Sequence, residues 1–291
     1  MPADINTQIK STRPILPRLI PYAYVAPALC VTLLFSFVSM AISLYVSFQH
    51  YDAFAGRSDF AGLSNYRRAL FEADSYFWLA LRNTAVYSAM SVVGVLVTAL
   101  PLALLCLRAR YGQSLFRTLY FLPSITPGVV LALVFFQIFG VWGGLLDSRY
   151  TALPALALLG IWAGAGYNMV LFLAGLTEIP SHFYDAAKVD GAGPWQQFCH
   201  VTIPMLRNTL VFVTVMTIIG SFQVFTSVYI MTGGGPERST SVIAYTIFIN
   251  AFAVAGQMGY ASALAWLLFA VIFVFVLIQM RIFRSRKIYD E

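Results

Sequence analysis

The sequence predicts an all-α polytopic membrane protein with six transmembrane helices, and two observations lead to that prediction. First, 59% of the 291 residues are hydrophobic and only 10% are charged, whereas soluble domains average about 25% charged and 45–50% apolar residues. Second, the apolar residues form runs as long as the roughly 20 residues that a helix needs to cross a bilayer. The net charge of +6 fits basic cytoplasmic loops, and without a basic-aromatic cluster it does not indicate nucleic acid.

A single transmembrane domain is predicted at 21–283, between an N-terminal tail at 1–20 and a C-terminal tail at 284–291. The first tail is basic, as in a signal peptide, but the apolar run after it exceeds the roughly 7–15 residues of a cleavable segment. We therefore expect an uncleaved first span. The six spans are predicted at about 22–48, 83–107, 119–139, 153–176, 210–231 and 261–282.

Two further segments are predicted to lie at the membrane interface. The stretch NYRRALFEADSYFWLAL, residues 65–81, has aromatic and basic side chains at helical spacing, which favours an interfacial helix at headgroup level. The apolar stretch from Val242 to Ala255 has only 14 residues and is interrupted by Asn250. It is too short to cross, so we expect a re-entrant or interfacial segment on the outer side.

Helix-breaking and polar residues inside the spans are candidates for lining a pathway. Pro123 and Pro127 each remove a backbone donor from the third span, so a kink is expected, and the freed carbonyls must face protein or a water-filled path. Tyr167 and Asn168 in the fourth span, and Gln223 in the fifth, need partners in mid-membrane. Helix packing and interhelical hydrogen bonding are the alternative explanations for each of them.

The distribution of basic residues predicts which ends of the spans are cytoplasmic. With six spans, both termini and the loops at 108–117 and 181–208 lie on one side of the membrane. That side holds 12 Lys and Arg residues and the opposite side holds 6, which satisfies the positive-inside rule. A seventh span at 242–255 would remove most of that bias. We therefore expect both termini to be cytoplasmic.

The loop at 181–208 is the longest polar break in the second half of the chain, and its sequence predicts two short helices around a turn. Pro180 stops the fourth span, and Ser181 is expected to cap a helix over 182–189. Asp185 is expected in the first turn of that helix, where its charge favours the helix N-terminus.

Glycine, proline and alanine positions predict the rest of this loop. Gly191 follows the first helix, where it lets the chain turn through positive φ. Pro194 suits the start of a second helix, which Pro204 is expected to end. The small side chains of Ala186 and Ala187 allow the backbone of another protein to come close. The loop is therefore interpreted as a cytoplasmic docking element.

Within this loop, DAAKVDGAGPWQQFCHVTIP resembles the conserved loop of ATP-binding-cassette (ABC) importer permeases. That loop reads roughly E-A-A, three residues, G, then nine residues to I-x-L-P. Here Asp185 to Ala187 stand for the first element, Gly191 for the glycine and Val201 to Pro204 for the end. Asp185 replaces the usual glutamate and Ile203 replaces the usual leucine.

The resemblance covers nearly the whole chain. FAGLSNYRRAL, ALRNT, LYFLPSITP, WAGAGYNMVLFLAGLTEIP and YIMTGGGP are all similar to the sugar-uptake branch of that family, which includes maltose, lactose and glycerol-phosphate permeases. The GLSNY and TGGGP stretches resemble the MalF-type subunit rather than its MalG-like partner. The resemblance implies a permease subunit that moves a sugar or sugar derivative, a mono- or oligosaccharide or glycerol phosphate, into the cytoplasm.

The same resemblance implies the partners and the location. A second, MalG-type permease would complete the channel, two cytosolic ABC ATPase subunits would bind the loop, and an extracytoplasmic sugar-binding protein or lipoprotein would deliver the solute. The chain would lie in the inner membrane of a bacterium or archaeon as a transport subunit and not an enzyme. ATP and Mg²⁺ would belong to the ATPase, and no cofactor is expected on this chain. The three Cys and three His show no metal-site spacing.

The residues and the resemblance together give two sets of candidate site residues. Tyr167, within a stretch that also holds Trp162 and Gly164, matches a sugar-contacting position of maltose-type permeases, and an aromatic face with a hydroxyl suits a sugar. Contacts with the ATPase are expected from Tyr184, Asp185, Ala186, Ala187, Asp190 and Gly191. The candidate substrate path comprises Ser124, Gly128, Gly164, Tyr167, Asn168, Gly220, Ser221 and Gln223.

Two other functions are weighed against this one. An ABC importer permease could take another small polar solute instead of a sugar. A stand-alone secondary transporter would need coupling carboxylates or an internal repeat, and the predicted spans show neither, since Glu178 lies at the end of the fourth span. A membrane scaffold would not need the DAAKVDGAG loop.

Overall fold

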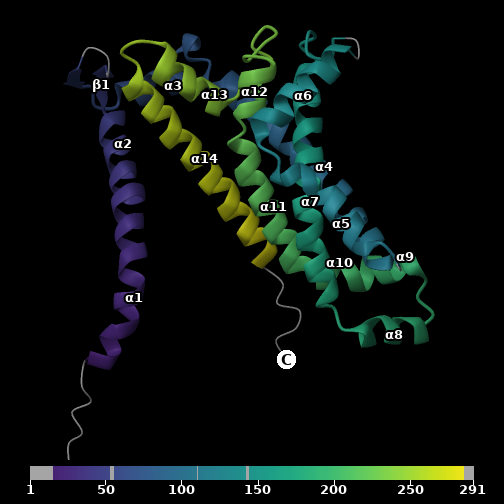
Figure 1. Cartoon of the computed structure of the whole chain (residues 1–291). Coiled ribbons are helices and arrows are strands. Elements are labelled where there is room, and N and C mark those ends of the chain that lie inside the picture. The colour runs from purple at the N-terminus through teal and green to yellow at the C-terminus, as the bar shows by residue number, and fades with distance from the viewer. Residues whose placement is uncertain (1–15, 53–55, 110, 142–143, 285–291) are drawn as a thin grey trace, which may run out of the picture. The chain divides into compact units, whose positions relative to one another are not determined.

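The computed structural model describes residues 16–52, 56–109, 111–141 and 144–284 (Figure 1). It forms two compact units, which divide between Val46 and Ser47, and each is described by itself. Most of the tail predicted at 1–20 and nearly all of the tail at 284–291 lie outside the described residues.

The first unit is helical along its described length. Helix α1 (Leu16–Thr32) continues through a π-helical segment, η1 (Leu33–Val38), into α2 (Ser39–Ser47). The apolar part, Tyr24–Ser47, has 24 residues and a mean hydropathy of 2.2, which is long and apolar enough to cross a membrane. The first span predicted at 22–48 falls on this segment.

The second unit contains the remaining elements. They follow the chain in the order β1 (Gln49–Asp52), β2 (Arg57–Phe60), α3 (Ser64–Phe71), η2 (Ala73–Ser75), α4 (Phe77–Arg108), α5 (Gln113–Ile125), α6 (Gly128–Val141), α7 (Ala152–Thr177), α8 (Ser181–Val189), α9 (Pro194–Gln197), η3 (Phe198–Thr202), α10 (Ile203–Met205), α11 (Arg207–Phe222), α12 (Thr226–Met231), α13 (Ile243–Phe248), η4 (Ile249–Ala253) and α14 (Met258–Arg284).

The predicted all-α polytopic class is confirmed. Within the described ranges, five helical segments are long and apolar enough to cross a membrane, and α5 with α6 makes a sixth if the bent pair counts as one span. The five are Tyr24–Ser47, Phe77–Arg108, Ala152–Thr177, Arg207–Met231 and Met258–Ile282.

The third and fifth spans are broken helices. The axes of α5 and α6 enclose 95°, a larger change than the predicted kink. The break lies at Thr126, which has an extended backbone (φ −75°, ψ 133°) because the residue before a proline is disfavoured in the helical region. Pro123, by contrast, lies inside α5 without ending it. The fifth span, predicted at 210–231, divides into α11 and α12 around residues 223–225.

The prediction of one interfacial helix over residues 65–81 is wrong. Helix α3 ends at Phe71, and α4 begins at Phe77, after a left-handed residue, Tyr76, at φ 51°. The Ser75 hydroxyl donates a hydrogen bond to the Ala69 carbonyl (2.9 Å), which holds the chain reversed between the two helices. An antiparallel hairpin of β1 and β2, which we did not predict, precedes α3.

The segment expected to be too short to cross forms α13 and η4. Together they form one apolar helical segment, Ile243–Ala253, which has 11 residues and is shorter than the candidate spans. Asn250 donates its side-chain amide to the Thr246 carbonyl (2.8 Å), one helical turn earlier. The interfacial position of this segment remains a prediction.

The core of the second unit lies where α4 packs against α7 and α11. Ile161 on α7 occupies the space beside Gly94 on α4, and Gly166 on α7 lies against the backbone of α5 at Tyr120. The hydroxyls of Ser88 on α4 and Ser221 on α11 are 2.6 Å apart, so a hydrogen bond joins these two helices. Small residues and hydroxyls at helix contacts are typical of packing in membranes.

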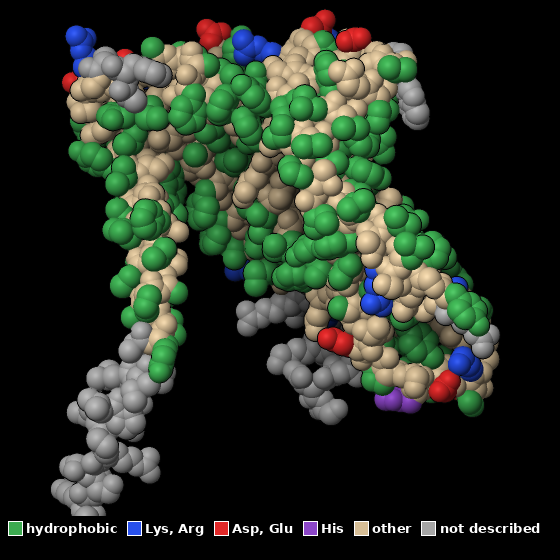
Figure 2. All heavy atoms as spheres, viewed as in Figure 1, with side chains coloured by type: hydrophobic (Ala, Val, Ile, Leu, Met, Phe, Trp, Pro, Cys, Tyr) green, Lys and Arg blue, Asp and Glu red, His purple; other side chains and the backbone are tan. Residues whose placement is uncertain are grey.

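Figure 2 shows how side chains are distributed on one face of the second unit. Hydrophobic side chains cover the middle of this face. Lys, Arg, Asp and Glu side chains gather at the end that carries α3 and α13 and at the opposite end around α8 and α9 (Figures 1 and 2). This pattern is expected for a unit that spans the hydrocarbon region between two aqueous faces.

Candidate functional site

Helices α4, α7 and α11 enclose a cavity of about 290 Å³, which we call the central cavity. The lining residues come from the middle of α4 and α7 and from the C-terminal half of α11 and the break after it. Its lining comprises Tyr87, Ser91, Val95, Gly160, Gly164, Tyr167, Asn168, Met216, Thr217, Gly220, Ser221 and Val224.

Tyr167 and Asn168 give the central cavity much of its polar character. Tyr167 is 45% exposed, so its ring and hydroxyl are open to a solute. The Asn168 amide donates to the Gly164 carbonyl at 2.8 Å, which fixes the side chain and leaves its oxygen as an acceptor.

Ser91 is the most unusual group in the lining. Its hydroxyl is buried and has no hydrogen-bond partner among the described residues. A buried polar group without a partner is unfavourable, and this hydroxyl lies beneath the cavity surface rather than open to a solute. The lining contains no Asp, Glu, Lys, Arg or His, so it can bind by hydrogen bonds and ring contact but offers no charged group.

Glycines keep part of the central cavity open. A Cβ atom at Gly220 would meet nothing within 4 Å, and one at Gly164 would have neighbours only at 3.7 Å. Side chains at these two positions would therefore project into open space and reduce the volume available to a solute. At Gly160 the space is instead filled by the Tyr87 hydroxyl from α4.

The structure brings together five of the eight residues predicted for the substrate path. The five that line the central cavity are Gly164, Tyr167, Asn168, Gly220 and Ser221. Ser124, Gly128 and Gln223 do not line it. The Ser124 hydroxyl donates to the Phe121 carbonyl of its own helix (2.6 Å), Gly128 begins α6, and Gln223 is an exposed residue at the break after α11.

Sequence reasoning missed the contribution of α4. Tyr87, Ser91 and Val95 follow one another at four-residue intervals, which places them on one face of the helix. Two polar side chains at that spacing inside an apolar span could have indicated this lining face.

The loop at 181–208 forms the predicted pair of short helices, with three differences. Pro180 and not Ser181 occupies the N-cap position, and Ser181 is the first residue of α8. Asp185 is consequently the fifth residue of α8, beyond its first turn. Its carboxylate forms an exposed ion pair with Lys188 at 2.9 Å. Pro204 does not end the second helix but lies inside α10. The π-helical segment η3, which precedes it, has a different pattern of backbone hydrogen bonds, so a residue without an amide hydrogen is tolerated there.

Gly191 adopts the predicted left-handed conformation, with φ 79°. The amide of Gly191 donates to the Lys188 carbonyl (3.0 Å), and the Ala192 amide donates to the Ala187 carbonyl (2.8 Å). These bonds close the C-terminus of α8 and reverse the chain toward Pro194, the first residue of α9.

Helix α8 is held at one side and exposed elsewhere. The hydroxyls of Tyr184 and Thr202 are 3.0 Å apart, so a hydrogen bond ties α8 to η3. Ala186 and Asp190 are exposed, and Ala187 is partly buried. Val189 is 87% exposed and Trp195 is 74% exposed. Exposed apolar side chains of this size beside a flat alanine face suit a protein partner.

Comparisons with known proteins agree with this geometry. A family model described as binding-protein-dependent transport system inner membrane component matches residues 91–289. The probable ABC transporter permease protein YurN of Bacillus subtilis (strain 168) is 33% identical over 93% of this chain and 98% of YurN. The lactose transport system permease protein LacF of Rhizobium radiobacter is 29% identical over 91% of this chain and 94% of LacF.

A solved structure shows the same fold. A chain of a bacterial ABC transporter involved in the import of the acidic polysaccharide alginate matches with a TM-score of 0.78 at 20% identity, over 94% of this chain and 98% of that one. Permeases of this family work with a partner permease, with separate ATPases that hydrolyse ATP, and with a periplasmic binding protein. The chain belongs to the family of binding-protein-dependent transport system inner membrane components and is a multi-pass permease subunit of an ABC importer.

Proposed function

We propose that this permease subunit carries a sugar or sugar derivative into the cytoplasm, and that the central cavity is its side of the path. The observation that supports this most directly is the uncharged lining around the exposed ring of Tyr167. The name of the relative LacF, a lactose transport system permease protein, also favours a sugar.

The lining suits the two kinds of surface that a sugar presents. The exposed ring of Tyr167 offers an aromatic face for the C–H side of a pyranose. The amide oxygen of Asn168 offers a hydrogen bond to its hydroxyls. Since the lining has no cation, this side of the path favours an uncharged mono- or oligosaccharide over glycerol phosphate.

The proposal includes the partners expected from the sequence. A second, MalG-type permease supplies the other side of the path, and a sugar-binding protein or lipoprotein delivers the solute from outside. Two cytosolic ATPase subunits bind ATP and Mg²⁺, which this chain does not bind. One of them receives α8 through the coupling residues, and closure of the ATPase dimer rocks the permeases around the central cavity. The coupling residues are Tyr184, Asp185, Ala186, Ala187, Asp190 and Gly191.

Tyr167 provides the test of the cavity. We expect Tyr167→Ala to lower sugar uptake about tenfold or more, because it removes both the ring and the hydroxyl, while the amount of assembled complex stays unchanged. Tyr111→Ala is the matched control, since Tyr111 is 85% exposed and lies outside the cavity. The solute itself would be identified by screening ligands for ATPase stimulation in the co-purified complex with its binding protein. Normal uptake by the Tyr167→Ala complex would remove the central cavity from the path.

The orientation in the membrane has its own test. We propose an inner-membrane protein with both termini in the cytoplasm, because the basic residues gather on that side. A reporter that is active only in the periplasm should give no signal when fused after Glu291, and a cytoplasmic reporter should be active there. A periplasmic signal would overturn the six-span topology and the cytoplasmic position of α8 with it.

A further inference from the structure

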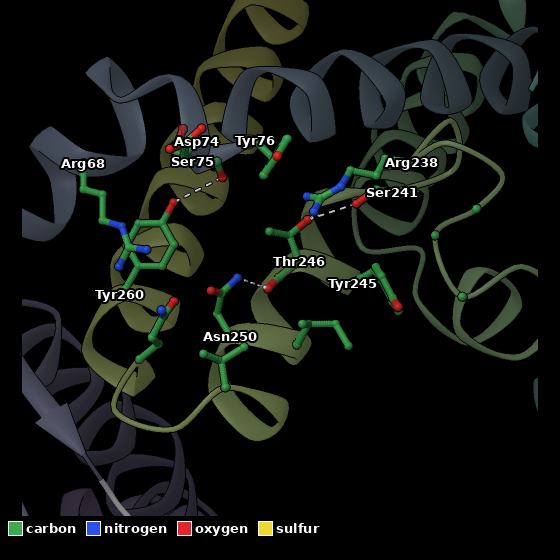
Figure 3. Close-up of a pocket in the computed structure, with 16 residues that line it drawn as sticks. Arg68, Asp74, Ser75, Tyr76, Arg238, Ser241, Tyr245, Thr246, Asn250 and Tyr260 are labelled. Atoms are coloured by element: carbon green, nitrogen blue, oxygen red, sulfur yellow. Dashed lines mark hydrogen bonds between the residues drawn. The ribbon is translucent and has the colours of Figure 1, made fainter.

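A second cavity, of about 490 Å³, lies at the end of the second unit opposite α8 (Figures 1 and 3). We call it the outer pocket, since the proposed function places that end outside the cytoplasm. Side chains from α3, α13 and α14 line it, together with the turn between α12 and α13. No residue of the central cavity takes part, so the two cavities are separate.

Two arginines from different segments face the outer pocket (Figure 3). The Arg238 guanidinium lies over the ring of Tyr76, with its Cζ 3.5 Å from the ring centroid. The Arg68 guanidinium lies over the ring of Tyr260 at 4.5 Å. A guanidinium stacked on a ring is held in place while its N–H edge stays available, and that edge fits a carboxylate.

The turn that carries Arg238 is held rigidly. Arg238 and the preceding Glu237 both have positive φ, 59° and 48°, a conformation that residues with side chains rarely adopt. Asn83 on α4 donates its amide to the Arg238 and Ser241 carbonyls, each at 3.0 Å. Arg149 pairs with Glu237 at 3.2 Å. A strained turn fixed by such contacts is typical of a site whose geometry matters for binding.

The charge of the outer pocket is unbalanced. Arg238 has no carboxylate within ion-pair distance in the part of the chain that the structure describes, and Arg68 has a long contact of 3.9 Å with Glu72. Asp74 also belongs to the lining, but its side chain lies outside the described structure. With Asp74 counted, the lining holds two Arg and one Asp, so it carries a net positive charge.

Three neutral polar groups of the outer pocket are engaged within the chain. Tyr260 donates to the Ser75 carbonyl (3.4 Å), Asn250 donates to the Thr246 carbonyl (2.8 Å), and the hydroxyls of Thr246 and Ser241 are 3.4 Å apart. Both stacked tyrosines also have one ring face covered by a guanidinium. Beside the Gln257 amide and the Tyr245 hydroxyl, the pocket offers two positively charged groups, which the central cavity lacks.

We propose that the outer pocket receives an acidic side chain of the binding protein, which Arg238 and Arg68 pair with when that protein docks. The inference rests on the proposed function for its outer location. The family supplies a binding protein that must contact this side of the importer, and the pocket has the charge that an acidic side chain complements. Such pairs select the correct partner and speed its association more than they add to affinity.

The test measures binding of the cognate binding protein to the purified importer in lipid nanodiscs, together with ATPase stimulation. Arg238→Glu should weaken binding at least about tenfold, because it places like charges together, and Arg68→Glu should have a smaller effect because Glu72 already lies near it. Arg238→Asn removes the charge with a residue that tolerates positive φ, so it tests charge without disturbing the turn. Arg67→Glu, an exposed neighbour of Arg68 outside the pocket, is the matched control and should bind within about twofold of wild type.

The possible outcomes separate the explanations. Rescue of Arg238→Glu by replacing one Asp or Glu of the binding protein with Lys would establish the pair. If both Arg238 variants bind the binding protein as the wild-type importer does, the inference is overturned. It is also overturned if an Arg238 variant loses direct binding of the sugar while its affinity for the binding protein is unchanged. If the wild-type importer shows no stimulation by its loaded binding protein, the proposed function itself fails. Equal loss in Arg67→Glu would also overturn the inference, because it would show a general charge effect.

Discussion

The two ends of the second unit are built in opposite ways. At the outer end, side chains donate to backbone carbonyls across several elements: Asn83 reaches the turn before α13, and Trp78 on α4 donates to the Leu70 carbonyl on α3 (2.9 Å). At the coupling end, α8 is largely exposed and is tied to η3 by the hydroxyls of Tyr184 and Thr202. The outer end is thus a fixed platform, whereas the coupling end leaves its helix open to a partner.

This difference shows that different interactions stabilise the two ends. Side chains of the outer end bond several backbone carbonyls within the chain, so its shape should persist in the isolated subunit. The coupling end leaves Val189 and Trp195 exposed, so it completes its packing only when the ATPase binds. Substitutions of the residues that anchor the outer end, such as Asn83, should therefore alter stability, and those on the exposed face of α8 should alter function.

The largest expected effect lies at the outer end. Asn83 is only 4% exposed, and Asn83→Leu keeps the number of side-chain heavy atoms while leaving two carbonyls without their donor. We expect a loss of about 2–4 kcal/mol in unfolding free energy. Tyr184→Phe, which removes one partly buried hydrogen bond at the coupling end, should lose only about 0.5–1.5 kcal/mol. Thermal unfolding of the purified variants measures both, and equal losses would contradict the contrast between the two ends.

The next effect is functional and lies at Gly191. Because its φ is 79° and a Cβ there would meet nothing within 4 Å, the cost of Gly191→Val is backbone strain of about 1–3 kcal/mol rather than a clash within the chain. We expect uptake and substrate-stimulated ATPase activity to fall about tenfold or more while the permease remains assembled.

Two variants serve as controls for Gly191→Val. Gly191→Asn should keep most activity, because asparagine tolerates positive φ. Gly193→Ala should behave like wild type, since Gly193 has an ordinary backbone (φ −69°). Normal transport by Gly191→Val would count against the coupling role of this turn.

The smallest effect is expected at Asp185. Its ion pair with Lys188 joins side chains that are 66% and 62% exposed, so Asp185→Asn should change stability by less than about 0.5 kcal/mol. The same variant should still lower ATPase coupling if the carboxylate contacts the partner. A titration of ATPase subunits onto the purified permease pair would measure that contact, and unchanged affinity would remove Asp185 from the coupling residues.

The sequence predicted the long helices and the loop well because both depend on local rules. An apolar run that begins and ends at charged or helix-breaking residues is enough to place α7, and the φ of Gly191 follows from its place after a short helix. The hairpin of β1 and β2 and the reversal at Tyr76 depend on contacts between segments, such as the hydrogen bonds from Asn65 to the Ser47 and Gln49 carbonyls. No local pattern indicates those contacts.

The same distinction applies to the candidate site. Tyr167 and Asn168 were predicted from their polarity within an apolar span, and Tyr167 also from the resemblance. Gly220 and Ser221 were predicted from their position in the fifth span, and all four line one cavity. Gln223 looked equally unusual, but the break between α11 and α12 leaves it exposed. The spacing of Tyr87 and Ser91 could have indicated the lining face of α4, but the burial of Ser91 is a property of the assembled structure.

The contact at Gly166 has a mechanical consequence. With no side chain there, the backbones of α7 and α5 touch at Tyr120, and helices in backbone contact cannot slide past each other without separating. Helices α5 and α7 should therefore move as one rigid body. Since only residues 178–180 separate α7 from α8, a force applied to α8 would reach α5 directly. The sharp bend before α6, rather than a hinge within α7, is then where the displacement would be absorbed.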